Sequence, residues 1–290
     1  MKKKYFVFLL FTLSLSAQIK GVVKDSITGK PISFVNIWVQ DENIGFTSEE
    51  NGEFSINTSE IIKKLLFSAL GYEKKTVLIK NSTEVKLKPT DYQLEEVLIF
   101  KTLGTKIIEI GKTKNATYQA FDNGPKIDTK FFSYLEKYKK TKYLKKVSIF
   151  TDNSIENASF KIHFYSVDTN GFPSTELLDK DFIVAVKKGV TKNIFDVTKF
   201  KLQMPKNGIF VGFEKLLIEK NKVEKITVDA NTNTTKKTIT YFPLLLYNRV
   251  ELESIYTFSG GKWNKKSKNS DNLKDKISVN EPAVTLILTN

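Results

Sequence analysis

The single histidine is the first place to look for chemistry, because imidazole is the one side chain whose ordinary pKa lies near neutral pH. The chain has 290 residues, with one histidine, His163, and no cysteine. These counts exclude disulfides, thiolate zinc sites, cysteine nucleophiles and metal sites built on paired histidines. Much of the usual catalytic repertoire is therefore absent from this chain.

The local pattern around His163 predicts a β-strand. Alternation puts Phe160, Ile162 and Phe164 on one face and His163 on the other, more polar face, beside Lys161. We therefore expect His163 to be at the surface or half-buried, without a carboxylate that orients its ring. A general base needs such partners before its pKa matters, so we expect a structural histidine.

Carboxylates are the second candidates, because a glycosidase needs only two acids. Asp179 and Asp181 would share one face of a strand, and Glu251 and Glu253 would share another. Such pairs are more commonly edge charges that prevent strand-to-strand aggregation. We predict no catalytic residues.

Nucleotide and metal sites are not indicated either. Gly111-Lys112-Thr113 matches the end of a phosphate-binding loop, but Lys106 stands where that motif needs its first glycine. Asp152-Asn153 and Asp168-Thr169-Asn170-Gly171 offer oxygen ligands for calcium, without the spacing of an EF-hand. A plain Asx turn explains such segments as well, so we predict no cofactor and no metal.

One segment is unusually basic, and its lysines are interleaved with Tyr138 and Tyr143. We treat this cluster as a candidate patch for an anionic surface, the alternative being a solubilising surface. In an exported chain the anions would be lipopolysaccharide phosphates, acidic glycans or an acidic protein, and not nucleic acid. The patch comprises Lys137, Lys139, Lys140, Lys142, Lys145 and Lys146.

Trp263 is the candidate for stacking on a sugar ring. It lies beside Gly260-Gly261, and an exposed indole at this place could stack on a sugar. A tryptophan packed in a core or an interface is an equally good interpretation.

Export is predicted from residues 1–17, which combine Lys2, Lys3 and Lys4 with a short apolar run and end at Ser16-Ala17. The run is shorter than the ~20 residues that span a bilayer. We expect a periplasmic, outer-membrane-associated or cell-surface protein without a transmembrane segment after cleavage.

Short strands and turn signals follow this segment over residues 18–100. Val35, Ile37 and Val39 alternate as one buried face, and Asn51-Gly52 predicts a β-hairpin turn with a positive φ, which Asn and Gly tolerate. About seven such strands predict a compact β-sandwich. The 22 phenylalanines and 11 tyrosines far outnumber the two methionines, which also favours strands.

The order of these turns and strands carries a family resemblance. The segments that carry it are Gly21-Val22-Val23-Lys24-Asp25, Thr28-Gly29-Lys30-Pro31-Ile32, Asn51-Gly52-Glu53-Phe54, Gly71-Tyr72 and Leu94-Glu95-Glu96-Val97. Residues 18–100 resemble the carboxypeptidase regulatory-like domain, which also occurs in Bacteroidetes surface proteins and ahead of TonB-dependent receptor plugs. The resemblance implies a seven-stranded transthyretin-like sandwich without catalytic residues.

The remainder predicts a second all-β unit. Residues 101–130 form an expected connector that packs only in part, and residues 131–290 contain strands separated by polar loops. This pattern favours a larger jelly-roll-like β-sandwich.

From these patterns we expect a non-catalytic, exported protein of the cell envelope that binds a protein or surface partner. The alternatives are a glycan-binding module of the cell surface and an envelope glycoside hydrolase that uses two carboxylates.

Overall fold

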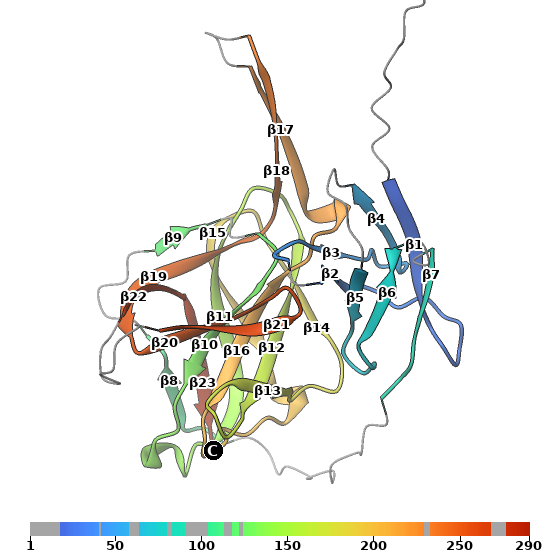
Figure 1. Ribbon diagram of the computed structural model, residues 1–290. Coiled ribbons are helices and arrows are strands. Elements are labelled where there is room, and N and C mark those ends of the chain that lie inside the picture. Colours follow the sequence, from blue (N-terminus) through green and yellow to red (C-terminus); the bar gives the residue numbers. More distant parts are fainter. Residues whose placement is uncertain are drawn as a thin grey trace, which may run out of the picture.

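The structure is a computed structural model that describes residues 18–40, 42–57, 64–79, 83–90, 104–112, 118–121, 124–228, 233–267 and 277–290. The described part of the chain is all-β, as predicted, with strands β1–β23 and only short 3₁₀ helices (Figure 1). The expected signal at residues 1–17 and the segment Leu94–Val97 lie outside the described residues. Within those ranges, no helix has the length and apolarity needed to cross a bilayer.

The N-terminal unit is the expected seven-stranded sandwich. One sheet has the order β4-β1-β7, and the other has the order β3-β2-β5-β6. The strands are β1 (Gln18–Asp25), β2 (Asn36–Val39), β3 (Gly45–Thr47), β4 (Glu53–Asn57), β5 (Lys64–Ser68), β6 (Lys75–Leu78) and β7 (Glu84–Leu87). Val35, Ile37 and Val39 are fully or almost fully buried between these sheets, which confirms the predicted alternation.

The turn at Asn51-Gly52 does not join a hairpin, so that prediction was wrong. Gly52 has a positive φ of 77°, as the sequence suggested. However, β4 pairs with β1, whereas the preceding strand β3 pairs with β2 in the opposite sheet. The turn therefore carries the chain from one sheet to the other.

The larger unit is a second sandwich of two seven-stranded sheets. One has the order β13-β12-β16-β10-β20-β21 with β14 beside β12, and the other has the order β22-β19-β11-β23-β8 with β15 beside β11 and β9 beside β19. The first sheet contains β10 (Ile127–Phe132), β12 (Ala158–Val167), β13 (Pro173–Glu176), β14 (Phe182–Val186), β16 (Ile209–Lys215), β20 (Ser254–Ser259) and β21 (Lys262–Ser267). The second contains β8 (Ile107–Ile110), β9 (Tyr118–Ala120), β11 (Tyr143–Asn153), β15 (Gly189–Asp196), β19 (Leu244–Leu252), β22 (Ile277–Pro282) and β23 (Val284–Thr289).

The core of this unit lies between the two sheets. Phe160, Ile162 and Phe164 of β12 are buried in it, as their alternation predicted. Strands β8 and β9 fall within the expected connector, and both join the second sheet. The 3₁₀ helices η2 (Glu136–Tyr138), η3 (Thr198–Phe200) and η4 (Glu219–Asn221) connect strands of this unit.

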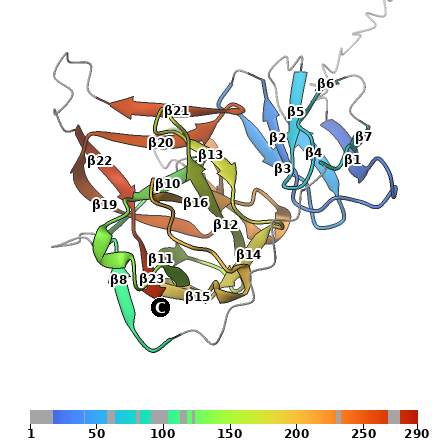
Figure 2. The same ribbon diagram turned by 90° about the horizontal axis from the view of Figure 1, so that it is seen from below.

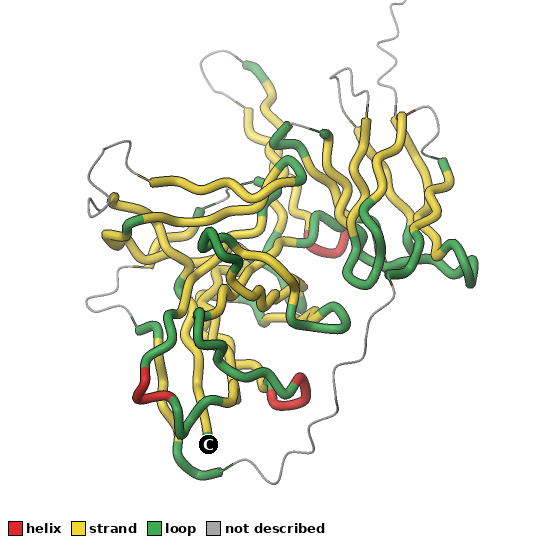
Figure 3. Tube along the Cα trace, turned by 60° about the horizontal axis from the view of Figure 1, so that its bottom comes forward, coloured by secondary structure: helices red, strands yellow, loops and turns green. Residues whose placement is uncertain are grey.

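A two-stranded ribbon projects from this body. Strands β17 (Lys222–Val228) and β18 (Thr235–Tyr241) pair with each other and form a separate sheet within the described part of the chain. Figure 1 shows the ribbon extending away from both sandwiches. The two sandwiches themselves lie side by side, as the views in Figures 2 and 3 agree.

Candidate functional site

The two sandwiches meet through a cluster of aromatic side chains. Trp38 of β2 is 4% exposed, and its ring meets the ring of Phe258 edge-on at 5.9 Å between centroids. The buried members of the cluster are Trp38, Ile127, Tyr165, Phe210, Tyr256 and Phe258. Since one member comes from the N-terminal sandwich and the rest from the larger one, this cluster is the core of the domain junction.

Polar contacts also link the two sandwiches. The Nζ atom of Lys161 donates to the carbonyl oxygen of Phe34 at 2.8 Å, and the backbone N–H of Leu217 donates to Oγ1 of Thr47 at 3.1 Å. The backbone N–H of Glu219 donates to a carboxylate oxygen of Glu49 at 2.8 Å. These bonds define how one sandwich sits on the other.

The turn between β20 and β21 lets the sandwiches approach closely. Gly260 and Gly261 both have a positive φ. A Cβ atom on Gly260 would lie 2.9 Å from the carbonyl oxygen of Glu42, and one on Gly261 would lie 2.6 Å from Cδ2 of Leu66. Only glycine suits both the backbone conformation and the space at this contact.

His163 lies between two carboxylates next to the same junction. Its Nδ1 atom is 2.8 Å from Oε2 of Glu176, and its Nε2 atom is 2.7 Å from Oε2 of Glu214. The ring also stacks on Tyr165, with 5.5 Å between centroids and 11° between planes. Two carboxylate acceptors require both ring nitrogens to donate, and only the imidazolium form does so.

Electrostatics agree with this assignment. Burial would lower the pKa of His163, but Glu176 and Glu214 outweigh it and raise that pKa to about 10. Burial would likewise raise the pKa of Glu214, but Lys161 and His163 hold it below its usual range. His163 is therefore a cation at neutral pH and cannot accept a proton as a general base.

The expected environment of His163 was thus wrong. The residue is 8% exposed, and it has two orienting carboxylates rather than none. Lys161 and Tyr165, on the same face of β12, are also buried. The reason is that the N-terminal sandwich helps to cover the face that the alternation of β12 predicted to be open.

Asp181 and Asp168, two of the remaining candidate carboxylates, make structural contacts. Asp181 pairs with the buried Lys161 at 2.9 Å, while Asp179 is exposed. Oδ1 of Asp168 accepts from the backbone N–H groups of Asn170 and Phe172, both at 2.8 Å, which is the expected Asx turn. Among the described residues, no group of three or more metal-ligating side chains could hold a metal ion.

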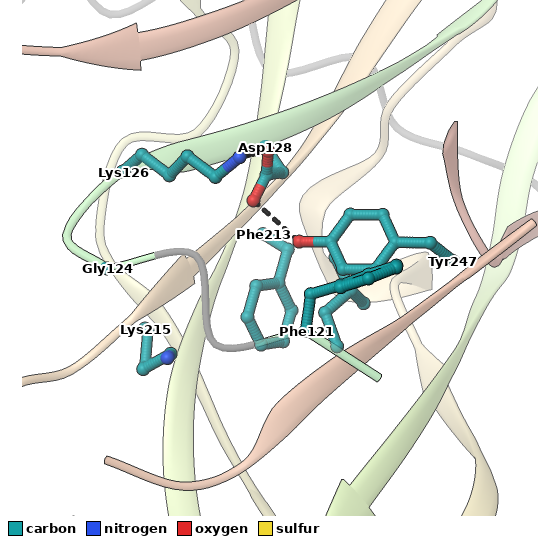
Figure 4. A pocket seen from close by; sticks show the side chains of 8 residues that line it. Phe121, Gly124, Lys126, Asp128, Phe213, Lys215 and Tyr247 are labelled. Carbon is teal, nitrogen blue, oxygen red and sulfur yellow. Dashed lines mark hydrogen bonds and ion pairs between the residues drawn. The ribbon is translucent and has the colours of Figure 1, made fainter. Parts of the chain in front are cut away.

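Figure 4 shows a pocket that includes Asp128 of β10. Its volume is about 10 Å³, which is the space for one water molecule. Oδ2 of Asp128 accepts from the hydroxyl of Tyr247 at 2.7 Å, and Oδ1 pairs with Lys126 at 2.8 Å. Both carboxylate oxygens are occupied, so this pocket offers no free acid and no room for a sugar.

The candidate lysine patch separates into two parts. Lys137, Lys139, Lys140 and Lys142 are exposed around η2 and the turn that follows it. Lys145 and Lys146 are half-buried on β11. Burial would raise the pKa of Asp196, but hydrogen bonds from Thr198 and the charges of the latter two lysines hold it below its usual range.

Trp263 is half-buried against the junction. Its ring meets Tyr165 at 5.1 Å and Phe258 at 5.2 Å, in both cases edge-on. Sequence alone left the stacking platform and the interface tryptophan as equal alternatives, and these contacts favour the interface.

A substitution of Trp263 tests that assignment. We expect Trp263→Ala to lower the free energy of unfolding by about 2–3 kcal/mol, because it removes two aromatic contacts and leaves a partial cavity. Trp263→Phe, which keeps an aromatic ring, should cost clearly less. Urea unfolding followed by circular dichroism measures both, and unchanged stability in the alanine variant would contradict the structural role.

Comparisons with known proteins agree with the N-terminal part of this description. Residues 19–99 match the family model of the CarboxypepD_reg-like domain, which confirms the resemblance seen in the sequence. No curated protein matches the chain. A solved structure described as "a putative carbohydrate binding protein from Bacteroides uniformis ATCC 8492" is similar over 80% of this chain and 99% of that one, at 12% identity and a TM-score of 0.22. At that TM-score the likeness bears no functional argument.

Proposed function

We propose that this chain is an exported, non-catalytic binding module of the cell envelope, and that the β17–β18 ribbon docks onto a protein partner with an acidic surface. The larger sandwich carries this ribbon, which projects away from both sandwiches. Export rests on the sequence pattern of residues 1–17. The absence of catalysis rests on the chemistry of the junction, where the histidine is a cation held between buried carboxylates.

The observation that carries the proposal is an apolar stripe on one face of the ribbon. Ile226 and Val228 alternate along β17 and are 67% and 60% exposed. Ile239 of β18 is 43% exposed and lies opposite Glu224, which shares a face with both. Residues opposite each other in an antiparallel pair lie on one face, so the three apolar side chains form one stripe.

The charges of the ribbon indicate the partner's chemistry; Lys222 and Lys237 share the face of the stripe, and Lys225 and Lys236 lie on the other face. The described residues of the two strands include the lysines 222, 225, 236 and 237 and one acid, Glu224. Lys222 and Lys237 both pair with Glu224, at 2.9 Å and 2.7 Å. The net positive charge favours an acidic partner, whose apolar strip would cover the isoleucine and valine side chains.

The ribbon also offers its backbone. Each strand pairs with the other along one edge only, and the described chain forms no further ladder with either. Such edges bind an added strand through main-chain hydrogen bonds, which is a common mode of protein recognition. An acidic, partly apolar strand of a partner therefore fits both the edge and the stripe.

A site-specific crosslink tests this proposal. A photo-reactive residue placed at Ile226 of the full chain should crosslink to an acidic protein in solubilised envelope fractions, because this side chain would be covered in the complex. The same group at Thr238, on the opposite face of the ribbon, is the matched control.

The charge requirement is tested separately. Lys237→Glu should abolish the crosslink from position 226, because Lys237 lies opposite Ile226 on the face of the stripe and its side chain is 54% exposed. Lys225→Glu, an exposed lysine on the other face, is the matched control and should leave the crosslink unchanged. Neither change should shift the thermal unfolding of the chain by much, since exposed ion pairs contribute little to stability. Equal crosslinking from both faces, or a crosslink indifferent to Lys237→Glu, would overturn the proposal.

A further inference from the structure

A second recess lies in the larger sandwich, away from the domain junction. It has a volume of about 160 Å³, and its walls come from five strands and the residues that flank them. The lining side chains that carry functional groups are Glu109, Lys112, Phe150, Lys192, Asn248 and Thr285. This combination joins an aromatic ring to several hydrogen-bonding groups in a space comparable to one sugar ring.

An ion-pair network forms one wall of the recess. Oε2 of Glu109 is 2.6 Å from Nζ of Lys112, and Oε1 is 3.3 Å from Nζ of Lys192. The hydroxyl of Thr285 donates to the same Oε1 at 3.2 Å. The hydrogen bond from Lys112 lowers the pKa of Glu109 more than burial raises it, and Lys192 lowers it further, so this pKa lies below its usual range. At neutral pH the wall therefore carries two positive charges and one negative charge.

Phe150 and Lys192 form a further part of the lining. The ammonium of Lys192 lies 5.6 Å from the centre of the Phe150 ring. Both residues are paired across the β11–β15 ladder, which fixes their relative position. An apolar ring beside an ammonium suits a ligand that has a C–H face and an anionic group.

Asn248 supplies an independent observation. It is 3% exposed, it lines the recess, and its Oδ1 atom is buried without a hydrogen-bond partner. Buried polar atoms are nearly always paired, and an unpaired acceptor destabilises the fold unless something else offsets it. A hydroxyl donor from a ligand would satisfy this atom.

We propose that this recess binds one acidic sugar unit of the uronic acid type. Its hydroxyls would donate to Asn248 and Glu109, its carboxylate would accept from Lys192 and Lys112, and its C–H face would pack on Phe150. The three charged side chains sum to one positive charge, which a single carboxylate neutralises. A phosphate, with about −1.5 to −2 charge, would face Glu109 at close range.

Ligand-observed NMR with the full chain tests the proposal. Sodium glucuronate should bind at least about tenfold more tightly than glucose or inorganic phosphate, since hydrogen bonds to a charged group outweigh neutral ones. Glucose binding equal to glucuronate binding, or tighter binding of phosphate, would overturn the assigned ligand class.

Two variants separate binding from folding. Lys192→Gln should weaken glucuronate binding about tenfold and leave the affinity for glucose unchanged, because it removes only the contact with the carboxylate. Asn248→Leu should abolish binding and leave the melting temperature unchanged or raised, because it replaces an unpaired amide by an apolar group of similar size. Lys225→Gln on the ribbon is the control. Wild-type glucuronate affinity in both variants would overturn the site.

Discussion

Replacing His163 with glutamine should lower the free energy of unfolding by about 3–5 kcal/mol at neutral pH, because it leaves buried carboxylates without the cation between them. The imidazolium contacts Glu176 at 2.8 Å and Glu214 at 2.7 Å, and glutamine carries no charge to replace it. Lys161 remains near Glu214 but already pairs with Asp181. Urea denaturation at pH 7 measures the loss.

The pH dependence of this contribution has a defined direction. The pKa of His163 rises from 6.5 to about 10 on folding because of the two carboxylates. A group whose pKa is raised in the folded state stabilises fully below its unfolded pKa, and this stabilisation is lost as pH rises through the folded pKa. The free energies of unfolding of the wild type and of His163→Gln should therefore converge as the pH rises from 6.5 to 10.

A double variant identifies the cause. His163→Gln combined with Glu214→Gln should lower the free energy of unfolding by less than the sum of the two single changes, because Glu214→Gln removes a carboxylate that His163→Gln leaves unpaired. Additive losses, or a difference that stays constant between pH 6.5 and pH 10, would show that the residue acts by packing and not by charge.

The second large effect is expected at Trp38. We expect Trp38→Ala to lower the free energy of unfolding by about 3–5 kcal/mol and to weaken the contact between the two sandwiches. The reason is that it leaves a cavity in the aromatic cluster at the domain junction. Calorimetry should show one transition for the wild type and two for the variant, since each sandwich has its own core.

Trp38→Phe is the matched control for this variant. Nε1 of Trp38 is buried without a hydrogen-bond partner, so phenylalanine removes an unsatisfied donor while it keeps an aromatic ring at the junction. This variant should retain a single transition. A single, barely shifted transition in Trp38→Ala would show that the junction does not depend on the indole.

Sequence patterns predicted those parts of the fold that depend on local alternation. The buried faces of β2 and β12 were read correctly from Val35, Ile37 and Val39 and from Phe160, Ile162 and Phe164. The turn chemistry of Asn51-Gly52 was also correct, since Gly52 has a positive φ. Which strands pair across that turn depends on long-range packing, and the predicted hairpin failed for that reason.

The junction could not be predicted, because it depends on how two separate units meet. His163 was assigned a polar, open face, and no local pattern indicated that Glu176 and Glu214 would flank it from 13 and 51 residues away. One signal was present: Lys161, His163 and Tyr165 all fall on the face opposite the core residues. Three large side chains with polar ends suit a face that is covered by another surface.

The glycine pair at the β20–β21 turn has a consequence for how this protein can be rearranged. A methyl group at Gly260 would collide with the carbonyl oxygen of Glu42, and one at Gly261 would displace the Leu66 side chain, so this turn is fitted to the surface of the N-terminal sandwich. An N-terminal sandwich transplanted alone would expose Trp38 and Leu66 to solvent as an apolar patch. Exchange of such modules between proteins would therefore have to move the receiving surface together with the sandwich.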